Sequence, residues 1–158
     1  MGSSKRYRVC FVCTGNICRS PMDEMVFADA LRREGLVHRV QVSSAGTGGW
    51  HVGNPADPRT AEALRRAGYE CKHVAAQLDS QHLSADLLVA LDSGHLAALR
   101  RLVAAPERVV LLRSFDPSAG RDLDVPDPYY GGKHGFDDVL GMVRAAVPGL
   151  LTWVRERL

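Results

Sequence analysis

A cysteine and an arginine mark the two ends of a short segment whose composition suits the binding of an anion. Segment 13–19 reads C-T-G-N-I-C-R, with Cys13 first and Arg19 last. Gly15 permits a tight backbone turn, and Asn16 is one of the few non-glycine residues that tolerate a left-handed conformation. The planar guanidinium of Arg19 can bind two phosphate oxygens at once. We therefore interpret the segment as a phosphate-binding loop, with Cys13 as a nucleophile that faces the bound anion.

The spacing of a cysteine and an arginine does not by itself establish catalysis. A cysteine at the end of a strand is often a small buried hydrophobic residue, and its reactivity depends on its surroundings. The surroundings here favour a reactive thiolate, because the N–H groups of a loop and the positive end of a following helix form an anion site. A nucleotide-binding loop of the Walker type would need G-x-x-x-x-G-K-[ST], which the sequence lacks.

Cys10 and Cys13 also form a C-x-x-C pair, which could indicate a zinc or redox site. The intervening Phe11 and Val12 continue a strand, however, and alternation places residues three apart on opposite faces of a strand. The pair is therefore not expected to chelate a metal. The four cysteines are too few for a disulfide framework in a chain of 158 residues, so we expect free thiols.

The proposed loop needs a strand before it and a helix after it. Residues 6–13 are rich in β-branched and aromatic side chains, which predicts a buried strand. A helix is predicted directly after the loop, with Ser20 as its N-cap and Pro21 at its first position. Asp23 and Glu24 are expected to interact favourably with the dipole of this helix.

Strands and helices alternate along the rest of the chain. The first helix should run to about Arg33, with Gly35 as its stop. Further strands are predicted at 40–44, 85–91 and 108–112, and helices from Asp57-Pro58 to Gly68 and from Asp92 to Leu102. A C-terminal helical region is expected to break near Pro148-Gly149. Such alternation implies right-handed βαβ crossovers. We predict an α/β fold, flavodoxin-like, in which one domain spans residues 1–158 and holds a parallel four-stranded sheet with helices on both faces. Ligands of such sheets lie beyond the carboxyl ends of the strands, where Cys13 stands.

A polar stretch rich in proline and glycine, residues 116–135, is long enough to be functional rather than a plain connection. Its carboxylates Asp122, Asp124 and Asp127 compete for the role of a proton donor. Spacing alone does not choose among them. The prolines on both sides of Asp127 stiffen its backbone, which favours it because a proton donor must be held in place.

Composition and charge argue against several other classes of function. The formal net charge is +2 and the basic residues are dispersed, so no nucleic-acid partner is expected. No apolar run approaches membrane-spanning length, and the first residues lack the apolar core of a signal peptide. Arg6 stands where N-myristoylation requires Ser or Thr. We expect a cytoplasmic monomer or weak dimer without a membrane partner.

Both candidate segments are similar to those of a known family. Residues 9–21, V-C-F-V-C-T-G-N-I-C-R-S-P, resemble the signature of the low-molecular-weight protein-tyrosine phosphatases, and residues 127–131, D-P-Y-Y-G, resemble the signature of that family's general-acid loop. The two occur in the family's order, and the resemblance covers essentially the whole chain. It implies Cys13 as the nucleophile, Arg19 as the clamp on the phosphate and transition state, and Asp127 as the general acid and later base.

The resemblance also implies roles for the surrounding residues. Ser20 would hydrogen-bond the thiolate, and Cys18 would trap oxidised Cys13 as a disulfide. The loop-supporting residues would be Asn16, Ser44 and His73, and the substrate-binding residues would be Thr14, Gly15, Asn16, Ile17, Cys18, Trp50, Tyr129 and Tyr130. Alternatives stay open at this point: His73 could be an ordinary histidine, Trp50 could cap the core, and the two tyrosines could be core aromatics.

The implied activity is hydrolysis of phosphotyrosine in tyrosine-phosphorylated proteins through a phosphocysteine, without a metal or other cofactor. One alternative is an arsenate reductase on the same fold. It would need a close-set pair of cysteines downstream, where only Cys71 remains. A second alternative is a catalytically silent phosphate-binding module. Such a module should have lost Cys13, Arg19 or the acid, and this chain retains all three.

Overall fold

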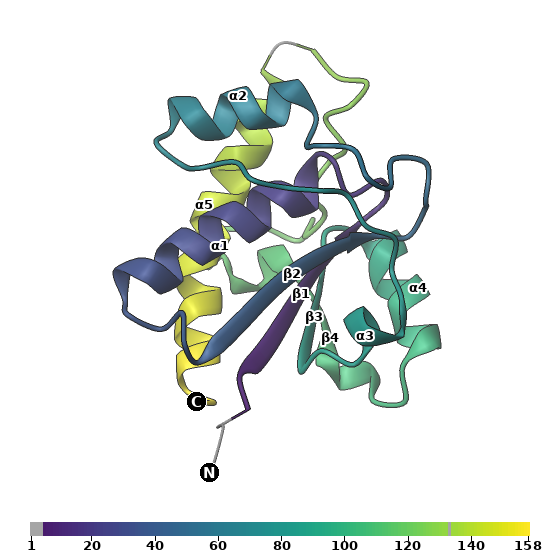
Figure 1. Ribbon diagram of the computed structural model, residues 1–158, viewed down its shortest axis with the longest axis vertical. Coiled ribbons are helices and arrows are strands. Elements are labelled where there is room, and N and C mark those ends of the chain that lie inside the picture. The colour runs from purple at the N-terminus through teal and green to yellow at the C-terminus, as the bar shows by residue number, and fades with distance from the viewer. Residues whose placement is uncertain (1–4, 133) are drawn as a thin grey trace.

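The computed structural model describes residues 5–132 and 134–158 (Figure 1). Within this part of the chain, four parallel strands form one sheet in the order β2-β1-β3-β4. The strands are β1 (Tyr7–Cys13), β2 (Val40–Gly46), β3 (Leu87–Ala90) and β4 (Val109–Leu111). The predicted α/β fold with a parallel four-stranded sheet is confirmed, and the strand order is that of flavodoxin-like sheets.

Helices cover both faces of the sheet, as predicted (Figure 1). They are α1 (Arg19–Arg33), α2 (Pro58–Arg66), α3 (Ser80–Leu83), α4 (Ser93–Leu102) and α5 (Gly135–Arg155), with 3-10 helices η1 (Pro106–Arg108) and η2 (Leu112–Phe115). α1 and α5 pack together on one face, with α2 against both, while α3 and α4 lie on the other face. Among the described residues, no helix is both long and apolar enough to cross a membrane.

The central strand β1 contributes to the core on both faces because its side chains alternate. Phe11 faces the larger core, where its ring meets that of Phe27 from α1 edge to face at 5.8 Å. Cys13 faces the same core, whereas Cys10 belongs to the smaller core beneath α3 and α4. Cys10 and Cys13 therefore lie on opposite faces of β1, as predicted, and do not form a joint site.

The predicted break near Pro148 and Gly149 is wrong. α5 continues through both residues to Arg155. Gly149 serves the packing of this helix, because a Cβ at that position would overlap the carbonyl oxygen of Phe115 in η2. The absence of a side chain thus permits a close approach of two elements. Pro148 is exposed on the helix surface, where its ring meets solvent instead of another element.

The start of α1 also differs from the prediction. The helix begins at Arg19 with Cys18 at the N-cap position, and no side chain caps it. Ser20 lies inside the first turn, so its predicted N-cap role is wrong. The first turn contains no acidic residue, so the expected effect of Asp23 and Glu24 on the helix dipole is wrong as well. An uncapped helix start leaves its N–H groups available to an anion, which is the physical reason for the difference.

The start of α2, in contrast, follows the predicted pattern. The Asp57 side chain accepts a hydrogen bond from the N–H of Arg59 at 2.9 Å, and Pro58 occupies the first helical position. Gly68, with φ of 91°, ends the helical region, as predicted. This well-capped helix places Arg59 beside the segment before α5, which contributes to the site described next.

Candidate active site

A cleft of about 390 Å³ opens at the carboxyl end of β1, facing the segment before α5. It is lined by Cys13, Thr14, Gly15, Ile17, Cys18, Arg19, Trp50, His51, Asp127, Tyr129 and Tyr130. Every predicted substrate-binding residue lines this cleft except Asn16, which is fully buried. The structure adds His51, which the sequence analysis missed although it adjoins the predicted Trp50.

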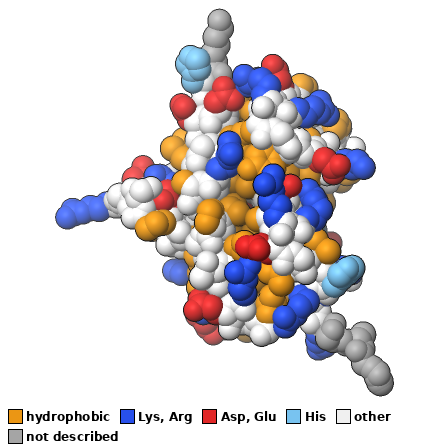
Figure 2. All heavy atoms as spheres, turned by 90° about the vertical axis from the view of Figure 1, so that its left-hand side faces the viewer, with side chains coloured by type: hydrophobic (Ala, Val, Ile, Leu, Met, Phe, Trp, Pro, Cys, Tyr) orange, Lys and Arg blue, Asp and Glu red, His pale blue; other side chains and the backbone are white. Residues whose placement is uncertain are grey.

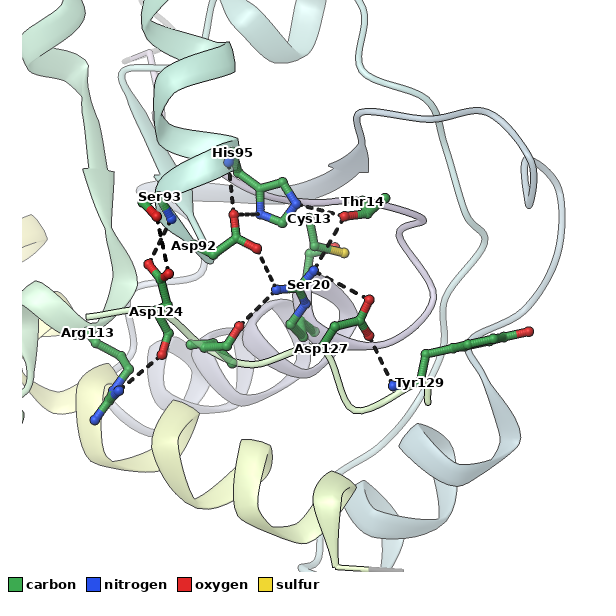
Figure 3. A network of polar contacts seen from close by, with 12 residues as sticks. Cys13, Thr14, Ser20, Asp92, Ser93, His95, Arg113, Asp124, Asp127 and Tyr129 are labelled. Atoms are coloured by element: carbon green, nitrogen blue, oxygen red, sulfur yellow. Dashed lines mark hydrogen bonds and ion pairs between the residues drawn. The ribbon is translucent and has the colours of Figure 1, made fainter. Parts of the chain in front are cut away.

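Cys13 and Ser20 are in direct contact inside the loop (Figure 3). The Cys13 Sγ and Ser20 Oγ atoms are 2.9 Å apart, and both residues are buried. Asn16 Nδ2 donates to the same Ser20 oxygen at 2.8 Å. Because this oxygen already accepts a hydrogen bond, its own O–H is free to donate to the sulfur. Ser20 thus places a hydrogen-bond donor on the sulfur of Cys13.

Asn16 connects the loop to two other segments of the chain. Its backbone is left-handed, with φ of 58°, as the sequence predicted. Its side chain also donates to Ser44 Oγ at 3.0 Å and accepts from the N–H of Ala76 at 2.9 Å. The backbone carbonyl oxygen of Asn16 lies 2.6 Å from His73 Nε2. Ser44 Oγ in turn donates to Glu24 at 2.5 Å, a member of the network that the sequence analysis missed. These contacts support the interpretation of His73 as a loop-supporting residue.

The guanidinium of Arg19 is buried, and hydrogen bonds on the side away from the cleft hold it in place. Its Nη1 donates to the carboxylate of Asp92 at 2.9 Å and to the carbonyl oxygen of Val125 at 2.8 Å. Its Nη2 lies toward the cleft, 3.4 Å from Thr14 Oγ1 and 3.8 Å from an oxygen of Asp127. One half of the guanidinium is therefore held by the protein, and the other half faces the space where a phosphate would bind.

Asp92, which holds Arg19, is a third site residue that the sequence analysis did not assign, after His51 and Glu24. It caps α4 by accepting a hydrogen bond from the N–H of His95 at 2.9 Å. Burial acts to raise the pKa of Asp92, but the hydrogen bonds from His95 and Arg19 outweigh burial and lower that pKa overall. A signal was present in the sequence, because Asp92 follows a predicted strand and the carboxyl ends of parallel strands meet at one edge.

The structure distinguishes the three candidate carboxylates. Asp127 lines the cleft, and its Oδ1 accepts a hydrogen bond from the N–H of Tyr129 at 3.0 Å. Asp124 instead accepts from the N–H and hydroxyl of Ser93, at 2.8 and 3.1 Å (Figure 3). Asp122 accepts from the N–H of Asp124. Neither Asp122 nor Asp124 lines the cleft, so the geometry favours Asp127 as the proton donor.

Aromatic side chains form the mouth of the cleft. Trp50 is 75% exposed and Tyr130 is 90% exposed, so neither is a core residue. The Tyr129 and Tyr130 rings meet edge to face at 4.8 Å, and the Arg59 guanidinium lies 5.3 Å from the Tyr129 ring. These rings can contact an aromatic leaving group.

The four cysteines are all free thiols in the structure. Burial raises the pKa of the Cys18 thiol to about 12, so Cys18 is protonated beside the reactive Cys13. Among residues 5–132 and 134–158, no three His, Cys, Asp or Glu side chains are grouped so that they could hold a metal ion. Arg19 and the loop N–H groups supply positive charge to the cleft.

Attack by Cys13 on a phosphorus atom held by Arg19 would form a phosphocysteine, so the fold and the cleft together define the class of cysteine-dependent phosphate-ester hydrolases. The comparison with known families agrees with this class. The chain belongs to the family described as low molecular weight phosphotyrosine protein phosphatase, which matches residues 8–158.

Individual relatives extend this comparison. The chain is 58% identical over 157 residues to a low molecular weight protein-tyrosine-phosphatase of Streptomyces coelicolor, and the match covers 96% of each chain. The crystal structure of YfkJ from Bacillus subtilis is 35% identical, covers 99% of each chain and has a TM-score of 0.90. The drosophila arginine phosphatase DARP is 26% identical, with a TM-score of 0.84, over 92% of this chain and 96% of its own.

Proposed function

We propose that the protein hydrolyses phosphotyrosine in protein substrates, with Cys13 as nucleophile, Arg19 as phosphate clamp and Asp127 as general acid and base. The observation that carries this proposal is the convergence of these three side chains on one cleft at the end of β1. The family to which the chain belongs supports the same activity, as does the name of its Streptomyces relative.

In the first step, the Cys13 thiolate attacks phosphorus in line with the bond to the phenolic oxygen. An S–P bond forms as the O–P bond breaks, and Asp127 donates its proton to the departing oxygen. Arg19 and the loop N–H groups stabilise the negative charge on the transferring phosphoryl group. The product of this step is a phosphocysteine and a free tyrosine hydroxyl.

In the second step, water attacks the phosphocysteine while the Asp127 carboxylate accepts a proton from the water. The S–P bond breaks, inorganic phosphate forms, and Cys13 leaves as a thiolate. Ser20 stabilises this leaving group by donating a hydrogen bond across the 2.9 Å contact with the sulfur. Asn16, Ser44 and His73 support the loop through the hydrogen bonds described above.

The mouth of the cleft supports an aromatic substrate. Trp50, Tyr129 and Tyr130 line the cleft and can contact a phenyl ring whose phosphate reaches Arg19. Phosphoserine is shorter and has no ring, so it would lose these contacts.

The remaining parts of the proposal concern the state of the protein. We propose a single domain over residues 1–158 that acts in the cytoplasm as a monomer or weak dimer, with neither nucleic acid nor a membrane as a partner. The dispersed basic residues and the four free thiols support this proposal. Sedimentation of the purified chain and fractionation of cells that produce it would test the two claims.

Release of inorganic phosphate from a phosphotyrosine peptide in the presence of EDTA tests the proposed activity. Turnover should persist with the chelator. Cys13→Ser should abolish turnover while inorganic phosphate still binds, because Arg19 and the loop N–H groups remain. Cys71→Ser is the matched control, since Cys71 lies outside the cleft, and it should keep wild-type activity.

Two results would contradict the proposal. Turnover by Cys13→Ser above background would refute the assignment of the nucleophile. Preferential hydrolysis of a phosphoarginine peptide over the matched phosphotyrosine peptide would move the substrate class to the one named for the drosophila relative.

A further inference from the structure

A buried histidine joins Asp92 to the wall of the cleft. His95, in α4, is 6% exposed, and its Nε2 lies 2.8 Å from the hydroxyl oxygen of Thr14. Its Nδ1 lies 3.1 Å from Asp92 Oδ1 in an ion-pair contact that is not a regular hydrogen bond, so the attraction between them is electrostatic. Figure 3 shows the resulting chain from Asp92 through the imidazole to Thr14, whose side chain lines the phosphate cleft.

The charge of Asp92 fixes the tautomer of a neutral His95. An imidazole nitrogen 3.1 Å from a carboxylate must carry the hydrogen, because its lone pair would otherwise face a negative charge. Nδ1 is therefore the protonated nitrogen and Nε2 is an acceptor. Thr14 then donates its O–H to His95, and the lone pairs of its oxygen face Arg19 Nη2 at 3.4 Å and the cleft.

A proton on His95 reverses this hydrogen bond. In the imidazolium both nitrogens carry hydrogen, so Nε2 donates to the Thr14 oxygen. The hydroxyl hydrogen of Thr14 is then free to turn into the cleft. Thr14 changes from a group that presents lone pairs to a bound phosphate into one that can donate to a phosphate oxygen.

The charges around His95 set when this proton is bound. Burial is the largest effect and lowers the pKa of His95, and the positive charge of Arg19 lowers it further. The negative charges of Asp92, Asp127 and Asp124 raise this pKa, but the net result lies below the ordinary value for histidine. His95 is thus neutral in the empty site at neutral pH. A dianion beside Arg19 adds negative charge near the imidazole and favours uptake of the proton.

We propose that His95 is a positioning residue that couples proton binding to anion binding, by turning the Thr14 hydroxyl into a hydrogen-bond donor to the phosphoryl group. The inference rests on the proposed function, because the anion it serves is the phosphate ester in the cleft. A hydroxyl that donates a hydrogen bond to a charged oxygen of the anion strengthens anion binding roughly tenfold. A hydroxyl that turns its lone pairs toward the same oxygen does not strengthen binding. Anion affinity should therefore rise as pH falls, through His95 and Thr14 together.

Inorganic sulfate is the probe for the test, because its charge stays constant between about pH 5 and about pH 8, the range in which histidine titrates. Calorimetry in buffers of different ionisation enthalpy measures sulfate affinity and proton uptake together. Other ionisable groups in the cleft can contribute to the proton uptake, so the comparison is between wild type and His95→Gln, which can hydrogen-bond Thr14 but cannot become charged. His95→Gln should take up fewer protons than wild type when sulfate binds. At low pH its affinity for sulfate should be roughly tenfold weaker than that of wild type.

Thr14 provides variants that do not depend on the folding of His95→Gln. Thr14→Val removes the hydroxyl at constant shape and should flatten the pH dependence of sulfate affinity as His95→Gln does, whereas Thr14→Ser should retain it. The imidazole NMR signal that is present in wild type and absent in His95→Gln identifies His95. Titration of this signal in wild type should give a higher pKa for His95 in the sulfate complex than in the free protein.

Wild-type pH dependence in either His95→Gln or Thr14→Val would overturn the proposal, and so would a His95 signal unaffected by sulfate. Because sulfate binding needs no turnover, these results are distinct from a failure of the proposed phosphatase activity, which would appear as absent hydrolysis by a wild type that still binds sulfate.

Discussion

Replacement of Asp23 by alanine should stabilise the protein, although Asp23 lies next to the phosphate-binding loop. Asp23 is completely buried in α1, and neither of its carboxyl oxygens has a hydrogen-bond partner among the described residues. Buried polar groups are nearly always paired, so this carboxyl is a local cost to folding. Figure 2 shows the face that contains α1, where hydrophobic side chains lie between the charged ones.

The size of the effect follows from three contributions. An unpaired buried polar group costs about 1–3 kcal/mol, and alanine is better than aspartate in a helix by up to about 0.7 kcal/mol. Against these gains, the space left by the carboxyl group costs about 1 kcal/mol. With the full gain in helix preference, Asp23→Ala should therefore raise the free energy of unfolding by about 0.7–2.7 kcal/mol near neutral pH.

The gain should depend on pH with a definite sign. Burial raises the pKa of Asp23 well above its usual value, and Arg19 offsets this only in part. Folded protein then holds a proton that the unfolded chain releases, so wild-type stability falls as pH rises from the unfolded pKa to the folded one. Below this window both states are protonated and the penalty from ionisation is absent. The advantage of Asp23→Ala should grow as pH rises through the window.

Urea unfolding of wild type, Asp23→Ala and Asp23→Asn at an acidic and a neutral pH measures both effects. Asp23→Asn should remove the pH-dependent part and leave an unpaired amide. Asp29→Ala is the matched control on the same helix, because it removes ion pairs with the exposed side chains of Arg32 and Arg33 and should cost no more than about 1 kcal/mol. Destabilisation by Asp23→Ala, or a difference from wild type that does not change with pH, would refute the reasoning.

Three further predictions concern catalysis, oxidation and α5. In steady-state kinetics, Asp127→Asn should lower turnover of a phosphotyrosine peptide by roughly 10²- to 10⁴-fold, and turnover of an aryl phosphate with an acidic leaving group much less. If the control Asp124→Asn shows this pattern instead, the wrong carboxylate has been assigned. Peroxide should inactivate wild type reversibly and Cys18→Ser irreversibly, because Cys18 can intercept the sulfenic acid of the catalytic cysteine; equal recovery of activity with thiol reductant would count against this. Pro148→Ala should raise the free energy of unfolding by about 1–3 kcal/mol, and Gly149→Ala should lower it; urea unfolding that reverses either sign would contradict the account of α5.

The phosphate-binding loop could be predicted from sequence because its chemistry is local. Cys13, Asn16, Arg19 and Ser20 lie within eight consecutive positions, and the chain itself brings them to one turn. The left-handed conformation of Asn16 follows from an intrinsic property of that residue type. The strand before the loop and the helix after it carry equally local patterns, which is why the α/β fold was predictable too.

The groups behind Arg19 could not be predicted in the same way. Asp92 is 73 positions from Arg19, and His95 is 81 positions from Thr14. Their contacts depend on how β1 and β3 pair in the sheet, which places the start of α4 beside the loop. The predicted break in α5 was wrong for a similar reason, since local helix preference carries no information on the packing of Gly149 against Phe115.

These long-range contacts explain how Arg19 is ready for an anion before one arrives. Both hydrogens of its Nη1 are used, one by Asp92 and one by Val125, so two-point contact with a phosphate must come from Nη2 and Nε. The side chain is thus fixed by the half that the substrate does not touch, and little rotamer entropy is lost when the phosphate binds. Asp92 balances the charge of Arg19 in the empty site without blocking it. A clamp built in this way takes its carboxylate from the segment that follows a second strand, β3, because residues of the loop itself lie on the side of the substrate.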